Sequence, residues 1–428
     1  MAVLRLSGPG SGPALARLSR RPLPPPRRAV LRRLLDPEGA APLDEALVLW
    51  LPGPASFTGE DMVELHLHGG CAVVEAVGAA LAALPGLRPA EPGEFARRAF
   101  LNGRLDLTRA EAIADLVAAE TEAQRRQALR QMGGALARLY DGWRERLVRA
   151  LAHLEATIDF AEEDLPQTLP DVARHDILVL HDEITQHLDD RGVGERLREG
   201  LVVVLVGAPN VGKSSLLNRL ARREAAIVSA TAGTTRDVIE VHLDLFGYPV
   251  TLLDTAGLRA AGDEIEAEGV RRALARAAEA DLKVALFDAT ADPVLDPATV
   301  ALVDARTIPV LNKIDAVTDC PNLNLGGSPL LPLSARTGAG LDGLAEALHA
   351  AVEKRLERHA STPPLTRARH RRALEDCREA LARALHASQP ELLAEDLRLA
   401  ARALGRITGR VDVEDLLDVI FRDFCIGK

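Results

Sequence analysis

The sequence predicts a multidomain chain of α/β plus all-α class, in which a doubly wound α/β unit is inserted into a helical domain behind an α+β region. Three observations predict this. Residues 200–350 alternate strand and helix patterns, the segments on both sides of them are helical, and residues 1–100 mix short strands with turns. The ends of a compact domain often lie close together, which makes such an insertion easy to build. The expected domains are 1–102, 103–198 with 355–428, and 199–354.

Composition sets bounds on the class of protein. The chain has 428 residues, of which 47% are hydrophobic, and no apolar run approaches the roughly 20 residues that cross a bilayer. We expect no membrane span and no signal peptide. Four scattered cysteines without metal-ligand spacing indicate a reducing, cytoplasmic protein. The net charge of −10 argues against a broadly basic nucleic-acid binder, so any RNA contact must be local or shared with a partner.

The first region carries the clearest strand signal. Residues 46–70 read as strand, Pro/Gly loop and strand, and residues 69–84 read as a helix entered through glycines. The second strand alternates an apolar set with a polar set, Val63, Leu65 and Leu67 against Glu64, His66 and His68. The two histidines could bind a metal, but histidines in such a pattern more often line a polar strand face.

The helical tract begins near Thr108, which has capping-box spacing to Glu111. It continues to about residue 198 and is interrupted at residues 162–170. Within the α/β unit, residues 241–254 predict a hairpin that turns at Gly247. After Lys354 the pattern is helical again to the end, apart from residues 361–364.

A phosphate-binding loop follows the strongest strand pattern. Gly207, Gly212, Lys213 and Ser214 match G-x-x-x-x-G-K-[ST], between a predicted strand and a predicted helix as this motif requires. The glycines let backbone N–H groups surround phosphates, the lysine reaches the β- and γ-phosphate oxygens, and the serine binds Mg²⁺. The residues expected to contact nucleotide are Asn210, Val211, Gly212, Lys213, Ser214 and Ser215.

Two further segments have the properties of nucleotide-sensing switches. The first is a Thr-rich loop in which Thr235, or alternatively Thr234, is the candidate to close over Mg²⁺ and the γ-phosphate. The second ends the strand "VTLLD", where Asp254 is expected to hold Mg²⁺ through water. The full candidate set is Ser229, Ala230, Thr231, Ala232, Gly233, Thr234, Thr235, Asp254, Thr255, Ala256 and Gly257.

The segment "VLNKID" predicts a base-specificity site for guanine. The Asp315 carboxylate can accept both edge N–H groups of guanine, whereas adenine leaves it unpaired, and sites of this kind discriminate by roughly 10⁴ to 10⁵. Asn312 and Lys313 belong to the same segment, and Ser334 with Ala335 in "LSART" supports the base contact. Four motifs in this order predict guanine-nucleotide binding with Mg²⁺.

Beyond the nucleotide motifs, the chain resembles the MnmE (TrmE) family of tRNA modification GTPases over nearly its whole length. The resemblance is carried by "VLRLSG", "FTGEDMVELHLHGG", "EPGEFARRAFLNGRLDLTRAEAIADL" and the terminal "FCIGK". It implies a Ras-like G domain (199–354) inserted into a helical domain, and an N-terminal domain (1–102) that binds folate and dimerises. It also implies that a tetrahydrofolate derivative (5,10-methylene or 5-formyl) donates a one-carbon unit and that the substrate is tRNA. The chain would form a heterotetramer with an FAD-containing MnmG (GidA) partner, and the two together would modify C5 of the wobble uridine.

The resemblance assigns further residues. The residues that match the family's folate contacts are Arg5, Glu64, Arg104 and Lys428. Position 104 is usually lysine in relatives, and arginine changes the geometry of the contact there. Leu258 stands where many GTPases have a water-orienting glutamine, and Glu266 is implied to replace it; from the residues alone Glu266 reads as a solvated helix residue. The resemblance assigns Ser214 and Thr235 as ligands of Mg²⁺, and Asn210, Ser229, Thr231 and Thr234 as ligands of K⁺.

Other readings remain open from sequence. Relatives carry a Gly-rich segment before the first strand, whereas this chain starts almost on it, which bears on folate binding and dimerisation. Cys425 is either a nucleophile or an inert thiol, and the Arg-rich stretches 17–33 and 367–372 contact tRNA phosphates or are solvated. A ribosome-assembly GTPase that binds rRNA without modifying it, and a switch with an external activator, are the competing functions.

Overall fold

The computed structural model describes residues 1–39, 41–159, 169–223, 226–227, 239–254, 279–356, 363–411, 417, 420–421 and 424. The chain divides into two compact units. Unit 1 contains Met1–Val117, Gln131–Leu180 and Asp376–Lys428, and unit 2 contains Ala118–Arg130 and His181–Glu375. In the part described, no helix combines the length and the apolar composition of a membrane span. The four domain boundaries expected from sequence stay a prediction.

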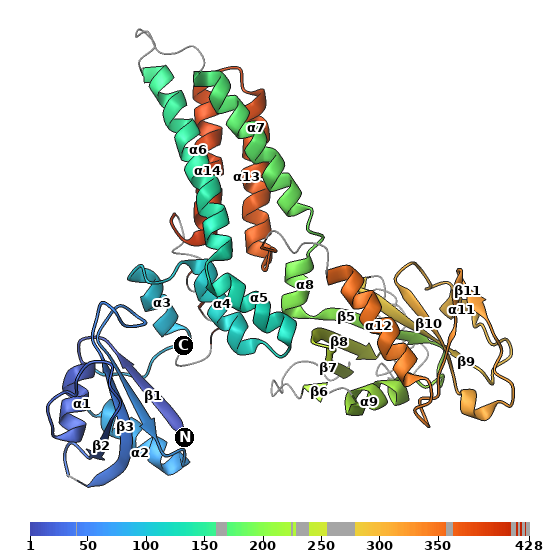
Figure 1. The fold of residues 1–428 in the computed structure, drawn as a ribbon, viewed down its shortest axis with the longest axis horizontal. Coiled ribbons are helices and arrows are strands. Elements are labelled where there is room, and N and C mark those ends of the chain that lie inside the picture. The colour runs from blue at the N-terminus through green and yellow to red at the C-terminus, as the bar shows by residue number, and fades with distance from the viewer. Residues whose placement is uncertain are drawn as a thin grey trace, which may run out of the picture. The chain divides into compact units, whose positions relative to one another are not determined.

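Unit 1 begins with a four-stranded antiparallel sheet in the order β1-β4-β3-β2 (Figure 1). Val63, Leu65 and Leu67 are buried, while Glu64 lies on the other, partly exposed face, so the predicted alternation is confirmed. The apolar face packs against helices α1 and α2. These elements are β1 Ala2–Ser7, α1 Ser11–Ser19, β2 Val30–Leu35, β3 Pro42–Leu51, β4 Met62–Leu67 and α2 Cys71–Ala82.

Among the residues that the structure describes, His66 of β4 and His68 directly after it each lie beside a carboxylate and are not part of a metal site. His66 lies 3.3 Å from the Glu64 carboxylate, and His68 lies 2.7 Å from Asp44. Among the described residues, no group of three or more His, Cys, Asp or Glu side chains could hold a metal ion. His66 therefore lies on the polar face of β4 with Glu64, and His68 pairs with Asp44 just beyond the strand.

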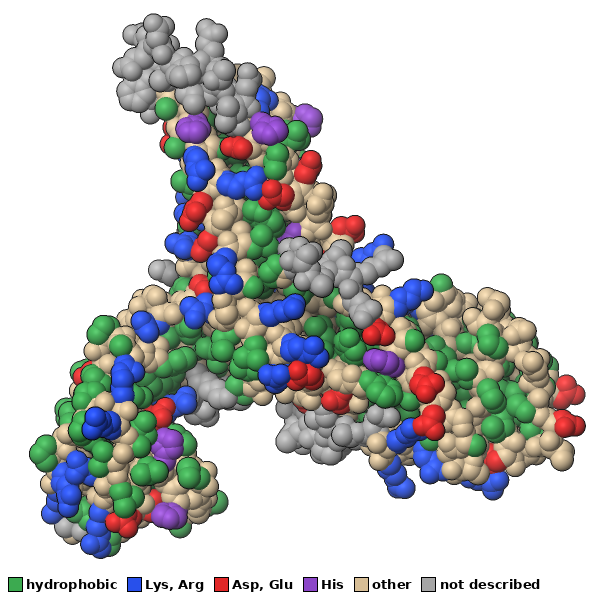
Figure 2. Space-filling model, in the orientation of Figure 1, with side chains coloured by type: hydrophobic (Ala, Val, Ile, Leu, Met, Phe, Trp, Pro, Cys, Tyr) green, Lys and Arg blue, Asp and Glu red, His purple; other side chains and the backbone are tan. Residues whose placement is uncertain are grey.

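Helices make up the rest of unit 1 and continue into unit 2. Helices α6 and α14 pack along each other, joined by the ion pair Arg398–Glu155 at 2.7 Å. Figure 2 shows basic and acidic side chains interspersed over this helical region, as on a solvated surface. The helices are α3 Glu94–Leu101, α4 Leu107–Ala118, α5 Glu122–Met132, α6 Ala135–Asp159, α7 Leu169–Leu188, α8 Val193–Glu199, α13 Ala368–His386 and α14 Pro390–Thr408.

The start of α4 corrects one expectation. Thr108 and Glu111 do not form the predicted capping box, because the helix begins one residue before Thr108. The Asp106 carboxylate accepts the Arg109 N–H at 3.0 Å and the Thr108 hydroxyl at 2.6 Å. Asp106 therefore caps the helix, since aspartate satisfies the same first-turn donors as serine or threonine.

Unit 2 contains a seven-stranded sheet in the order β13-β10-β9-β5-β8-β7-β6, with the antiparallel hairpin β7–β8 turning at Phe246 and Gly247 as expected. Strand β5 is buried on both faces, as in a doubly wound sheet: Val203 and Leu205 belong to one core cluster and Val204 and Val206 to the other. The strands are β5 Leu201–Gly207, β6 Ala226–Ile227, β7 Ile239–Leu245, β8 Tyr248–Asp254, β9 Leu282–Asp288, β10 Thr307–Asn312 and β13 Leu331–Pro332.

The helices that cover this sheet include α9 and α12, whose leucines join the first cluster (Figure 1). Strands β5, β8, β9, β10 and β13 run parallel, so their carboxyl ends meet at one edge, where α/β proteins bind ligands. The predicted class is confirmed. The remaining elements are α9 Lys213–Arg223, α11 Pro297–Val300, the 3₁₀ turn Ile314–Ala316, β11 Asn324–Leu325, β12 Ser328–Pro329 and α12 Leu341–Leu356.

Candidate functional site

The loop between β5 and α9 has the backbone that the phosphate-binding motif requires. Gly207 has φ of 155° and a Cβ there would lie 2.6 Å from the Leu286 carbonyl oxygen. Gly212 has φ of 105° and a Cβ there would collide with the Asn312 side chain. Both positions therefore need glycine, for the left-handed conformation and for close approach of the neighbouring loop.

Lys213 begins α9 and is 8% exposed. Its ammonium donates to the carbonyl oxygens of Gly207 at 2.8 Å and Ala208 at 2.9 Å. Burial lowers the pKa of Lys213, and the negative charge of Asp254 opposes this effect. An ammonium held beneath a loop of backbone donors is suited to an anionic ligand, because phosphate oxygens are stronger acceptors than carbonyls.

Ser214 and Asp254 come together at the adjacent ends of β5 and β8. The Ser214 hydroxyl donates to the Asp254 carboxylate at 2.6 Å, and Asp254 is 2% exposed. Strands β5 and β8 are parallel neighbours, with Leu205 opposite Asp254. Hydroxyl and carboxylate oxygens are the ligand types that Mg²⁺ prefers, so this pair fits the predicted metal site.

Asn312 ends β10 and joins three parts of the site. It is 1% exposed; its amide nitrogen donates to the Val211 carbonyl at 2.7 Å and its amide oxygen accepts the Ala335 N–H at 2.9 Å. One side chain therefore holds the phosphate loop against the loop that follows β13. A buried amide that satisfies both ends in this way fixes the distance between the two loops.

The base-specificity residues are pre-arranged by partners that the sequence analysis missed. Ser334 and Arg336 both donate to the Asp315 carboxylate, Arg336 through Nε at 2.7 Å. The Ser334 hydrogen bond, followed by that of Arg336, lowers the pKa of Asp315, so the carboxylate is ionised at neutral pH. The signal for Arg336 was its place directly after Ser334–Ala335 in "LSART".

Lys313 is held by a second missed residue, Asp288. The two side chains meet at 2.6 Å, and Asp288 lies opposite Asn312 in the β9–β10 register. Burial raises the pKa of Asp288, but the hydrogen bonds from Lys313 and Thr290 outweigh it, so the net shift is downward. No local pattern marks Asp288, because its relation to Lys313 depends on strand pairing.

Several predicted site residues lie outside the described residues. They are Ser229, Ala230, Thr231, Ala232, Gly233, Thr234, Thr235, Thr255, Ala256, Gly257, Leu258, Glu266, Cys425 and Lys428. The structure brings the described nucleotide-site residues together from four strand ends, those of β5, β8, β10 and β13, at one edge of the sheet. Asn210 is exposed in the phosphate loop and has φ of 59°, and Ser215 is exposed in the first turn of α9.

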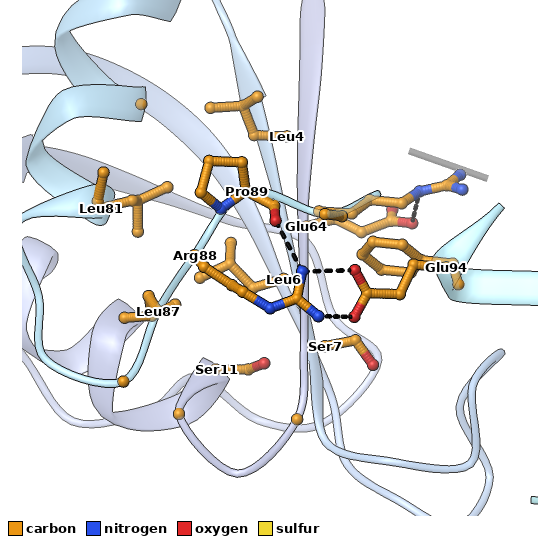
Figure 3. A pocket seen from close by; sticks show the side chains of 18 of the residues that line it. Leu4, Leu6, Ser7, Ser11, Glu64, Leu81, Leu87, Arg88, Pro89 and Glu94 are labelled. Atoms are coloured by element: carbon orange, nitrogen blue, oxygen red, sulfur yellow. Dashed lines mark hydrogen bonds and ion pairs between the residues drawn. The ribbon is translucent and has the colours of Figure 1, made fainter. Parts of the chain in front are cut away.

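Unit 1 contains a second candidate site, a pocket of about 790 Å³ beside β1 and β4 (Figure 3). Arg5 and Glu64 both line it, and Arg5 Nε donates to Glu64 Oε1 at 3.1 Å. Arg104 is not among the lining residues and lies against Gly59 instead. The structure therefore places two of the four expected folate residues together in a ligand-sized pocket.

A polar network that the sequence analysis did not find lines the same pocket. Arg88 binds both oxygens of Glu94, at 2.9 and 2.7 Å, and Arg98 also binds Glu94, at 2.7 Å. Burial raises the pKa of Glu94, but the hydrogen bond from the Glu91 backbone N–H, at 2.9 Å, and those from the two arginines outweigh it and lower the pKa to about 2. Arg98 continues the network to Glu60 at 2.9 Å.

The Arg-rich stretch at 367–372 contains a residue with a structural role. Arg371 donates to Asp190 at 2.6 Å and to Glu195 at 3.0 Å, all within unit 2. Burial lowers the pKa of Arg371, but the two carboxylates have the larger effect, so the net shift of the pKa is upward. Arg371 therefore anchors the segment that precedes α8.

Comparisons with known proteins cover the whole chain. The family model of the GTP-binding protein TrmE N-terminus matches residues 1–104, and that of the MnmE helical domain matches residues 107–425. The tRNA modification GTPase MnmE of Paramagnetospirillum magneticum is 61% identical over 428 residues, 100% of this chain and 96% of that protein. Its counterpart in Rhodospirillum rubrum is 58% identical over 440 residues, again 100% and 96%.

A solved structure resembles part of the chain. The G domain of the T. maritima FeoB iron transporter is 26% identical and covers 35% of this chain and 98% of that chain, with a TM-score of 0.28. A score this low supports no argument about function.

Proposed function

The chain belongs to the MnmE (TrmE) family and is a GTPase, and from that premise we propose that it uses GTP hydrolysis to drive C5 modification of the wobble uridine in tRNA. The group added is aminomethyl or carboxymethylaminomethyl. The observation that supports this proposal most strongly is the 61% identity to a tRNA modification GTPase across all of this chain and 96% of that protein. A ribosome-assembly GTPase would share only the nucleotide site.

Deletion of the gene should abolish the C5 modification of wobble uridine. The measurement is nucleoside analysis of bulk tRNA from the deletion strain. Re-expression of the wild-type chain should restore the modified nucleoside. A Lys213→Ala chain should not, because the phosphate loop loses its one cationic side chain. Unchanged tRNA together with immature rRNA would favour the assembly function instead.

The partners and compartment follow the same proposal. We place the chain in the cytoplasm as a homodimer that forms a heterotetramer with an FAD-containing MnmG-type protein and acts on tRNA. The described cysteines support a reducing compartment, since Cys71, Cys320 and Cys377 are free thiols. The interspersed surface charges and the net charge of −10 favour a tRNA contact shared with the partner.

Folate is proposed to bind the pocket of unit 1. The Glu64 carboxylate suits a pterin ring, whose adjacent N–H donors match a carboxylate as those of guanine do. The pocket volume of about 790 Å³ lies within the usual range for small-molecule sites. A bound tetrahydrofolate derivative would supply a one-carbon unit. Arg5 orients Glu64 through its hydrogen bond. Arg104 is not among the residues that line the pocket, and Lys428 lies outside the described residues.

Hydrolysis is proposed to depend on K⁺ and on pairing of two G domains. Leu258 cannot hydrogen-bond a water, so Glu266 takes that role. K⁺ would be held by Asn210, Ser229, Thr231 and Thr234, and Mg²⁺ by Ser214 and Thr235. The exposure of Asn210 in the phosphate loop supports a role for it at this surface.

GTP turnover should be about ten- to hundredfold faster in K⁺ than in Na⁺ at equal ionic strength, part of the roughly 10³–10⁵ that an arginine finger supplies. The measurement is phosphate release in KCl, NaCl and choline chloride. Asn210→Ala should remove the K⁺ advantage and leave the Na⁺ rate nearly unchanged. Equal rates in K⁺ and Na⁺ would remove the cation from the mechanism.

A further inference from the structure

Helix α5 is a continuous helix of 11 residues whose two ends belong to different compact units. Residues 122–130 belong to unit 2, and Gln131 and Met132 belong to unit 1. A rigid helix carries a shift of one end to its other end, and such elements are the usual carriers of energetic coupling between sites. The hydrogen bonds at each end of α5 therefore decide what it can couple.

The first turn of α5 holds the hairpin that joins the two expected switch segments. The Ala123 N–H donates to the carbonyl of Gly247, in the turn of the β7–β8 hairpin, at 3.0 Å. Strand β7 follows the Thr-rich loop, and β8 ends at Asp254, which accepts the Ser214 hydroxyl. A change in either switch segment therefore reaches the hairpin that α5 contacts.

Three glutamines extend these contacts along α5. They are spaced by four and three residues, so they share one face of the helix. Each donates its side-chain amide to a backbone carbonyl: Gln124 to Arg198 at 2.9 Å, Gln127 to Gly194 at 2.9 Å, and Gln131 to Thr108 at 2.8 Å. The first two carbonyls belong to α8, which leads into β5 and the phosphate loop, and the third belongs to α4.

The last turn of α5 is fixed to α4 within unit 1. Gln131 is 3% exposed, and Arg109 Nε of α4 donates to the Met132 carbonyl at 3.0 Å. Residues of α4 share an apolar cluster with α3 and with Phe421 and Phe424. Helix α4 is therefore the element of unit 1 on which a shift of α5 would act first.

Two of the glutamines keep an unpaired acceptor. Across the described residues, the Oε1 atoms of Gln127 and Gln131 are buried without a hydrogen-bond partner. An unpaired buried acceptor is costly, so this arrangement of α5 leaves hydrogen-bonding capacity unused. An element with two positions has this property when the second position pairs what the first leaves unpaired.

We propose that α5 couples the nucleotide state of the G domain to unit 1. The β7–β8 hairpin biases the position of α5 through the Ala123–Gly247 hydrogen bond, and α5 passes this bias to α4 through Gln131. Ala123 and Gln131 are positioning residues that do not touch nucleotide. The coupling rests on the GTPase activity of the chain and is independent of the proposed folate and tRNA chemistry.

Hydrogen exchange of the full chain measures this coupling. The exchange rates of the α4 amides are compared between the chain bound to GDP and the chain bound to a non-hydrolysable GTP analogue. In the wild type these rates should differ between the two nucleotides by at least about fivefold, the lower end of the usual range for coupled sites. The β7–β8 hairpin should also respond to the nucleotide.

Ala123→Pro breaks the contact at the hairpin, because proline has no N–H to donate and is tolerated in the first turn of a helix. The α4 response should disappear, while the hairpin still responds. Glu122→Pro is the matched control. It introduces the same residue one position earlier, where the N–H makes no hydrogen bond within the described part of the chain, so the α4 response should persist.

Gln131→Met breaks the contact at the other end of α5 and keeps the length of the side chain. It should also remove the α4 response and leave that of the hairpin. Arg130→Met is its control, since Arg130 is exposed on the same helix, and it should respond like the wild type. Because the two breaks lie at opposite ends of α5, one variant that fails to fold leaves the other as the test.

The ratio between the two nucleotides separates coupling from stability. A merely structural role would raise exchange in α4 equally with both nucleotides and leave their ratio unchanged, and that outcome for Ala123→Pro and Gln131→Met would overturn the proposal. Equal α4 rates with both nucleotides in the wild type would also overturn it. Neither result would bear on folate binding or on the modification of tRNA.

Discussion

Replacing Asp315 by Asn should change the nucleotide preference from GTP to XTP. The Asn carbonyl can still accept the ring N–H, but its NH₂ group faces the exocyclic NH₂ of guanine, donor against donor. Xanthine has a carbonyl at that position and accepts the new donor. Affinity for GTP should fall about 10²–10⁴-fold, since each of two charge-assisted bonds contributes a factor of roughly 10–100. Competition of GTP, XTP and ATP against labelled GDP measures the change.

Two control variants separate the base contact from its surroundings. Asp319→Asn removes the same charge four residues away at an exposed position and should leave GTP preferred. Arg336→Ala removes the 2.7 Å partner of Asp315 but keeps the carboxylate, so GTP should still bind more tightly than XTP. An Asp315→Asn chain that still preferred GTP would show that another group reads the base.

The nucleotide motifs could be predicted because each is local. Gly207, Gly212, Lys213 and Ser214 follow one another in a single strand-loop-helix segment, and their φ angles and contacts require those residue types. The parallel order of the sheet then brings distant segments to one edge. Ser214 and Asp254, which the sequence assigns to the same Mg²⁺ ion, meet there for this reason.

The partners that hold these residues could not be predicted. Asp288 reaches Lys313 only through the register of two strands. Asn312 looked like a nucleotide contact, yet its buried amide joins two loops. Such pairs depend on tertiary packing, which no short pattern records.

The unit 1 pocket shows the same limit. Pairing of β1 with β4 places Arg5 opposite Glu64, and the resemblance had named both. The pair Arg98–Glu60 had no signal, because the two residues lie 38 positions apart in the sequence and meet only in the folded domain. The capping prediction at Thr108 was wrong because Asp106, two residues earlier, offers a better-placed acceptor.

Replacing Glu266 by Ala should lower GTP hydrolysis by about 10²–10⁴-fold, the usual contribution of a positioned acid or base. Affinity for GTP should hardly change, because the carboxylate is proposed to orient water and not to bind nucleotide. This pattern, a loss in turnover without a loss in binding, is the kinetic mark of a contact made only in the transition state. Single-turnover phosphate release and binding of a non-hydrolysable GTP analogue measure the two quantities.

The sequence supplies two control positions for this prediction, Glu264 and Glu268, each two residues from Glu266. Alanine at either one removes the same charge, so a purely electrostatic effect of the segment on Mg²⁺ or phosphate would lower all three rates alike. A water-positioning role requires one carboxylate at one place, and only Glu266→Ala should then be inactive. If Glu266→Ala instead raised the nucleotide dissociation constant severalfold with little change in turnover, the residue would belong to binding. In that case no residue would be assigned to orient the attacking water, because the Leu258 side chain cannot form a hydrogen bond with it.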